Sequence, residues 1–139
     1  MDELHLMIHP LDKQAERGPV QQIGPLLRPM LRVSPQWAAA TLPLTFEEAL
    51  ARLEALPMAY TEPDGSFSWS GSGAAPFQFQ GLLHDRGERL SHVEILGHGE
   101  EEVMTRLIAA VAGDLKDLMI QSVREGKFYL AVASGRADL

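Results

Sequence analysis

The stretch FQFQGLLHDRGERLSHVEIL, from Phe77 to Leu96, decides the fold class. On both sides of a short polar turn, polar and apolar residues alternate with a period of two, which is typical of two half-buried strands. Asp85, Arg86 and Gly87 fit a three-residue hairpin loop, in which two residues form a type I turn and the glycine takes a left-handed conformation. We therefore predict an antiparallel hairpin closed by this loop.

The register of this hairpin follows by counting outward from the loop. The predicted cross-strand pairs are His84 with Glu88, Leu82 with Leu90, Gln80 with His92, Phe79 with Val93 and Phe77 with Ile95. Because side chains alternate between the two faces of a sheet, one face then carries Phe77, Phe79, Leu83, Val93 and Ile95. The opposite face is mixed in polarity and carries Gln78, Gln80, Leu82, His84, Leu90, His92 and Glu94.

Two further loops place a glycine third in a short polar turn between strand-like runs. The first loop is Pro63, Asp64 and Gly65, and it predicts a hairpin that puts Phe67 and Trp69 on one face. The second loop is Arg124, Glu125 and Gly126, for which counting pairs Ile120 with Leu130 and Leu118 with Val132. Most of the sheet is therefore expected to consist of hairpins with three-residue loops.

Two amphipathic helices interrupt the strands. Thr45 and Glu48 form a capping box, which predicts a helix that begins at Phe46 and ends before Pro57. A second helix is predicted over residues 100–112, because acidic residues open it, Gly113 suits a left-handed stop, and its apolar residues form one stripe. We expect both helices to cover the apolar face of the sheet.

The remaining segments complete a single α+β domain over residues 1–139. Leu4, Leu6 and Ile8 alternate with polar residues and predict a first strand. Residues 11–36 contain several prolines, so we expect a broken helix or a packed loop there. Residues 133–139 are expected to fray. The predicted order is strand, irregular segment, helix, four-stranded meander, helix and final hairpin.

Composition excludes several classes of protein. The chain has no cysteine, which removes disulfide frameworks, thiolate nucleophiles and cysteine-ligated metal sites. Its formal net charge is −7 and no basic cluster is evident, so nucleic-acid binding is not expected. Neither a signal peptide nor an apolar run of membrane-spanning length is present, which predicts a bacterial-type cytoplasmic protein without membrane contact.

No metal or cofactor is predicted. In the counted register His84 and His92 share a face, but their backbones lie four residues apart, or roughly 13 Å, which is too far for one ion. His5 and His9 have the same spacing on one strand. The Gly71 to Pro76 loop leads into a strand rather than a helix, so it lacks the helix N-terminus that holds a pyrophosphate.

Two functional hypotheses remain, and both use the mixed face. The first is a non-catalytic interaction module that presents this face, or an edge strand, to a protein partner or to its own copy. The second is a small metal-independent enzyme in which His92 and Glu94 transfer protons and His84 and Arg86 contact substrate. Whether residues 11–36 cover the mixed face within one chain is left open by the sequence.

Overall fold

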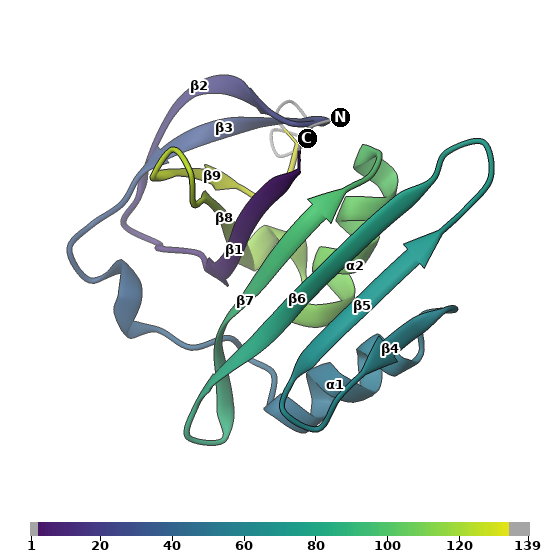
Figure 1. Cartoon of the computed structure of the whole chain (residues 1–139). Helices are drawn as coiled ribbons and strands as arrows, with labels where there is room; N and C mark the ends of the chain where they lie inside the picture. The colour runs from purple at the N-terminus through teal and green to yellow at the C-terminus, as the bar shows by residue number, and fades with distance from the viewer. Residues whose placement is uncertain (1–2, 134–139) are drawn as a thin grey trace.

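A nine-stranded antiparallel sheet and two α-helices make up the chain (Figure 1), and the predicted α+β class is confirmed. The computed structural model describes residues 3–133. The strands are β1 Leu4–Pro10, β2 Glu16–Ile23, β3 Leu26–Arg32, β4 Ala59–Thr61, β5 Ser66–Gly71, β6 Phe77–Arg86, β7 Arg89–His98, β8 Leu118–Ser122 and β9 Lys127–Leu130. Their order in the sheet is β2-β3-β9-β8-β1-β7-β6-β5-β4. The frayed tail predicted over 133–139 lies, beyond Ala133, outside the described residues.

The two helices are α1, Phe46–Glu54, and α2, Glu101–Ala112. The predicted capping box is present at the start of α1, and Gly113 ends α2 with a positive φ of 107°. Both helices lie on one side of the sheet, behind strands β7 to β4 in Figure 1. Their apolar residues share one buried core with inward-facing strand residues, among them Phe79, Val93 and Ile95.

The central hairpin has a different register from the predicted one. Gly87 and Glu88 form a two-residue turn, so Arg86 pairs with Arg89, and further along the strands His84 pairs with His92. Gly87 has the expected positive φ of 67°, but it stands first in a short turn rather than third in a longer loop. The pairing moves by three positions at the tip and, beyond an irregularity that follows His84, by four, an even number that leaves most side chains on the predicted faces.

Leu90 is the exception, because a register irregularity follows His84 and leaves Ser91 as the extra residue of β7. The bulge turns Leu90 into the core, where it is completely buried. Its N–H donates to the Leu44 carbonyl and its carbonyl accepts from Leu42 N–H, at 3.0 and 2.8 Å. The prediction that Leu90 lies on the mixed face is therefore wrong.

The other two predicted hairpins differ in outcome. Around Pro63–Gly65, Glu62 N–H donates to the Ser66 carbonyl at 2.9 Å, and the first hairpin buries Phe67 and Trp69 together as expected. The last hairpin has a four-residue loop, because Val123 belongs to the turn and Ser122 pairs with Lys127. The register predicted there is wrong by one residue, and the structure instead pairs Ile120 with Tyr129 and Met119 with Leu130.

Most of the segment predicted as irregular forms the β2–β3 hairpin. Gly24, with a φ of 59°, and Pro25 make its turn. The strands tolerate their prolines because Pro19 lies in the edge strand and Pro29 is opposite a register irregularity. The hairpin extends the sheet beyond β9 and does not lie over β6 (Figure 1).

A second, smaller core lies at this end of the sheet. It contains Leu31, Met119 and Leu130, and the residues packed against it include Leu11, Ala15, Val33, Trp37 and Phe128. Trp37 begins the short 3-10 helix η1, Trp37–Ala39, and a second such turn, η2 Leu115–Asp117, precedes β8. The connection from β3 to α1 therefore closes the β9–β8–β1 end and leaves β7 and β6 open.

Candidate functional site

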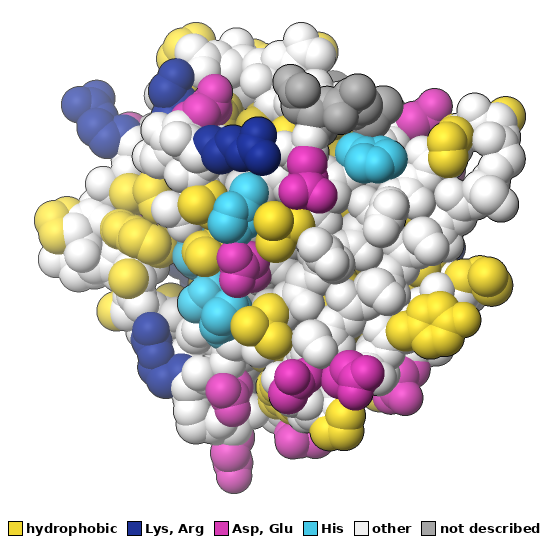
Figure 2. All heavy atoms as spheres, in the orientation of Figure 1, with side chains coloured by type: hydrophobic (Ala, Val, Ile, Leu, Met, Phe, Trp, Pro, Cys, Tyr) yellow, Lys and Arg dark blue, Asp and Glu magenta, His cyan; other side chains and the backbone are white. Residues whose placement is uncertain are grey.

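The sheet face turned away from the helices is the face shown in Figure 2, and we call it the open face. Strand pairing arranges its central side chains in three rows, beside an outer row of Ser70, Gln78 and His98. One row contains Tyr60, Ser68, Gln80, Leu96 and His5, and the next contains Ser66, Leu82, Glu94, Met7 and Gln121. The third is a histidine row of His84, His92 and His9.

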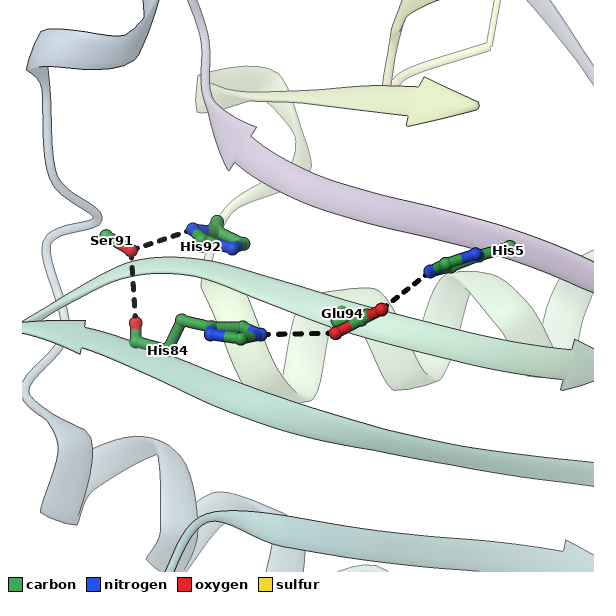
Figure 3. Close-up of polar contacts among 5 residues, drawn as sticks. All are labelled: His5, His84, Ser91, His92 and Glu94. Carbon is green, nitrogen blue, oxygen red and sulfur yellow. Dashed lines mark hydrogen bonds and ion pairs between the residues drawn. The ribbon is translucent and has the colours of Figure 1, made fainter. Parts of the chain in front are cut away.

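Glu94 lies at the centre of a hydrogen-bonded group on this face (Figure 3). Its carboxylate contacts His5 Nε2 at 2.6 Å and His84 Nε2 at 3.2 Å, so residues of β1, β7 and β6 are joined. The hydrogen bond from His5, supported by the one from His84, lowers the pKa of Glu94 against the opposing effect of burial. Glu94 is therefore an anion whose two oxygens each already have an imidazole partner.

The histidine row is a stack of rings across three strands. The rings of His84 and His92 lie 4.3 Å apart between centroids, and those of His92 and His9 lie 5.5 Å apart. Burial, with smaller contributions from the neighbouring histidines, lowers the pKa of His92 to about 4. Burial also lowers the pKa of His9, which is only 6% exposed. Both imidazoles are therefore neutral at pH 7.

Hydrogen bonds orient these two neutral rings, and the one made by His9 also fixes its tautomer. His9 Nε2 is 2.8 Å from Gln121 Oε1, an acceptor, so His9 carries its proton on Nε2 and its lone pair on Nδ1. Ser91 Oγ contacts both the His84 carbonyl, at 3.4 Å, and His92 Nδ1, at 2.7 Å. The Ser91 hydroxyl has one proton, so it donates either to the His84 carbonyl or, across the shorter contact, to His92 Nδ1. In both cases Nε2 is the nitrogen of His92 that Ser91 does not contact.

A pocket of about 210 Å³ lies beside the buried end of this row. Its walls include His9, His92, Trp37, Met7 and Arg86. Trp37 makes an edge contact with His9 at 4.8 Å between centroids and another with Phe128 at 4.8 Å. Arg86 donates to the carbonyls of Ala38 and Ala39 at 3.3 and 3.2 Å, which holds the η1 wall against the tip of β6.

A larger recess, of about 770 Å³, lies at the other side of the β6–β7 tip. It is formed by the start of α1, the β4–β5 turn and the β6–β7 turn, and its charged residues are Glu47, Asp64, Asp85 and Glu88. Figure 2 shows carboxylates gathered along this lower border of the open face. The recess contains no histidine and no basic side chain among its lining residues.

Six of the seven binding residues predicted from sequence lie on the open face: Gln78, Gln80, Leu82, His84, His92 and Glu94. Leu90 does not. The expected distance of roughly 13 Å between His84 and His92 is wrong, because the observed register places the two residues opposite each other. His92 and Glu94 share no hydrogen bond in the described part of the chain, since Glu94 contacts His5 and His84 instead.

Sequence reasoning missed the contributions of β1 and η1 to the site. The alternation around His5 and His9 indicated a strand, but no local signal identified β7 as its neighbour, 89 residues away in the case of His5 and Glu94. Trp37 lies outside any regular pattern. The only signal that could have indicated its role was a large aromatic residue in a stretch rich in proline and alanine.

Metal ligation finds no support in the side-chain positions. Among residues 3–133 no group of three or more His, Cys, Asp or Glu side chains converges as metal ligands would. Within the same residues, no helix is long and apolar enough to span a bilayer. Comparison of the chain with protein-family models, with curated proteins and with solved structures finds no match.

Proposed function

We propose that the chain is a non-catalytic interaction module that docks a partner protein on the open face. The observation that carries this proposal is the shortage of charge on that face. The chain has 12 basic and 19 acidic residues, yet in the three rows Glu94 is the only Asp, Glu, Lys or Arg, and both its oxygens are bonded to histidines. Depletion of charge is the compositional mark of the centre of a protein interface.

Apolar side chains interleave with the polar ones in the same rows. Leu82, Leu96 and Met7 are half-buried and lie among Gln80, His84 and Glu94. A face of this mixed polarity matches a non-obligate interface, which is about as apolar as ordinary surface and is formed between proteins that are also stable apart. The hydrogen bonds between His5, Glu94 and His84 hold the polar groups in place before docking.

The charge of the whole chain favours a partner with basic residues around its contact surface. Asp64, Asp85 and Glu88 line the recess beside the β6–β7 tip, and the chain carries a net charge of −7. Figure 2 shows carboxylates along the lower border of the open face. A basic rim on the partner would meet these carboxylates and increase the rate of association. Two copies of this chain would instead bring two acidic borders together, so a second copy is the less favoured occupant.

Acid–base catalysis by His92 and Glu94 is the competing function. It requires a base that is oriented by a partner and reaches a substrate proton. His92 is oriented by Ser91 rather than by Glu94, and Glu94 is shared between His5 and His84. The docking proposal uses these contacts as they stand, whereas the catalytic one needs them rearranged. An activity abolished by His92→Ala would favour catalysis.

The docking proposal is tested by Leu82→Glu, with Val20→Glu as the matched control. Val20 is 45% exposed on the edge strand β2, away from the open face, so the control adds the same charge elsewhere. We expect a partner captured from the source cells to be retained by the wild type and by Val20→Glu and lost by Leu82→Glu, with all three proteins folded. Retention of the partner by a folded Leu82→Glu protein would overturn the proposal. Sedimentation identifies a second copy as the occupant if the purified wild type is dimeric and only Leu82→Glu is monomeric.

A further inference from the structure

We infer that the pocket lined by Trp37, His9, His92 and Arg86 receives a phenol ring, the side chain of a tyrosine on the docked protein. The inference rests on the proposed function for the source of the ring. The chemistry of the pocket is argued from its own walls and can be tested without the partner.

The size of the pocket fits one side chain. Its volume of about 210 Å³ is below the roughly 300–1,000 Å³ of sites for drug-sized ligands. Trp37 and the imidazoles of His9 and His92 give it aromatic walls, and Met7 adds a polarisable thioether. Edge contacts with His9 and Phe128 hold the Trp37 ring in place. A single flat ring is the shape that such walls accept.

The hydrogen-bonding groups of the pocket favour a hydroxyl on that ring. His9 has its lone pair on Nδ1, because its Nε2–H donates to Gln121, and His92 Nε2 is the nitrogen that Ser91 does not contact. A phenylalanine ring could form no hydrogen bond with either nitrogen. A phenol carries one O–H that can donate to an imidazole nitrogen while its ring packs against Trp37.

The charge of the pocket excludes the other planar donor common at interfaces, the arginine side chain. Arg86 is the only residue with a permanent charge among those that line the pocket. A guanidinium ion would be repelled by Arg86, although the chain as a whole is acidic. The oxygen of a phenol, by contrast, can accept from a guanidinium N–H while its proton is donated to imidazole. A tyrosine is also among the residues that most often dominate interface energetics.

Titration with N-acetyltyrosinamide and N-acetylphenylalaninamide tests this inference on the purified full chain. Proton NMR follows the indole N–H of Trp37 and the ring protons of His92. We expect saturable shifts with a dissociation constant on the order of 1 mM for the tyrosine compound, and binding roughly 5- to 10-fold weaker for the phenylalanine compound. Equal affinity for the two compounds, or tyrosine-induced shifts that do not include Trp37, would overturn the inference.

A variant of His92 tests whether the preference for the tyrosine compound depends on the His92 imidazole. His92→Phe keeps a flat ring in the stack but removes the ring nitrogens, so the tyrosine compound should bind no better than the phenylalanine compound. His98→Phe is the matched control, because His98 lies on β7 outside the pocket lining, and it should keep the preference. Persistence of the preference in His92→Phe would contradict the assignment. If His92→Phe does not fold, the comparison of the two compounds on the wild type still decides whether the ring hydroxyl is recognised.

The source of the ring is tested with 4-methylphenol. A tyrosine socket tolerates the amide groups on both sides of the residue, so N-acetyltyrosinamide should bind at least as tightly as 4-methylphenol. Binding of 4-methylphenol alone would assign the pocket to a free phenol and overturn the link with a protein. If neither phenol binds, the docking proposal still stands, because the Leu82→Glu experiment tests it separately. If Leu82→Glu keeps the partner, the titrations with the phenols still test the chemistry of the pocket.

Discussion

His84 and His92 stack face to face across β6 and β7, with ring planes 13° from parallel and centroids 4.3 Å apart. Two imidazolium ions in this position would repel each other at close range, and His9 lies on the other side of His92. The stack therefore favours a neutral His92. His92 and His9 both belong to the wall of the pocket, so a charge on either ring would lie at the pocket.

His92 should titrate far below an ordinary histidine. Its pKa of about 4, against 6.5 for a free side chain, arises first from burial and then from the charges of His84 and His9, while Glu94 acts in the opposite direction. The folded state binds this proton less readily than the unfolded state, so the contribution to stability is complete above pH 6.5 and declines as the pH falls toward 4. NMR titration of the ring protons should give a midpoint near 4. A midpoint near 6.5 would contradict the buried stack.

Replacement of Glu94 should make the free energy of unfolding depend less on pH under acidic conditions. Hydrogen bonds from His5 and His84 lower its pKa, so its contribution to stability is present above the ordinary carboxyl pKa and is lost as the pH falls through the folded value. Glu94→Gln keeps the shape but removes the titration. As the pH falls below 4.5, the free energy of unfolding of the variant, measured with urea, should decrease less than that of the wild type. Parallel profiles for the two proteins would show that the contacts with His5 and His84 contribute nothing.

Truncation to alanine should destabilise the protein much more at Leu90 than at Leu82. Leu90 is fully buried, so Leu90→Ala should lower the free energy of unfolding by about 2–5 kcal/mol through lost burial and a cavity. Leu82 is half-exposed, and Leu82→Ala should cost about 1 kcal/mol. Denaturant unfolding of the two variants tests the bulge directly. Similar losses for both would mean that the two leucines share a face, as the counted register had it.

Two turn glycines provide a matched pair for backbone strain. Gly87 has a φ of 67° and no atom within 4 Å of an added Cβ, so Gly87→Ala should cost only the left-handed backbone, on the order of 1 kcal/mol. Gly65 has a φ of 95°, and its Cβ would lie 2.8 Å from the Phe46 ring and 3.1 Å from the Leu83 carbonyl oxygen. Gly65→Ala should therefore melt at a lower temperature than Gly87→Ala. The reverse order would refute the close packing of the first hairpin on α1.

Chelation should leave the melting temperature unchanged. No group of three or more potential ligands converges among residues 3–133, so no metal is expected to contribute to folding. Calorimetry with and without EDTA is sufficient for the measurement. A loss of several degrees that zinc restores would show that the histidines of the open face hold a metal in solution.

Local chemistry made some of these features predictable. The capping box at Thr45 and Glu48 places the start of α1 because every contact lies within one turn. The glycines at positions 65, 87 and 126 all have positive φ as expected, since the turns themselves require it. The buried faces of β6 and β7 followed from alternation, which survives a shift by an even number of residues.

The register and the site depend on contacts that no local pattern encodes. Gly87 is compatible with either a two-residue turn or a three-residue loop, and the choice is linked to the pairing of Leu90 with Leu42 and Leu44. Likewise, predicting the site required knowing which strand lies next to β1. His5 meets Glu94 only because the first strand inserts beside β7, so the sequence predicted half of the open face and could not predict the half that β1 supplies.

The central position of β1 sets the order in which the molecule can assemble. β1 pairs with β7 and β8, both of which follow it in the sequence, with β2 to β6 in between. The meander from β4 to β7 can form from neighbouring hairpins, whereas closing the loops to β1 carries a larger entropic cost and slows folding. Until β1 inserts, the meander carries Glu94 without His5, and His92 without His9. The open face is therefore complete only after β1 has paired with β7.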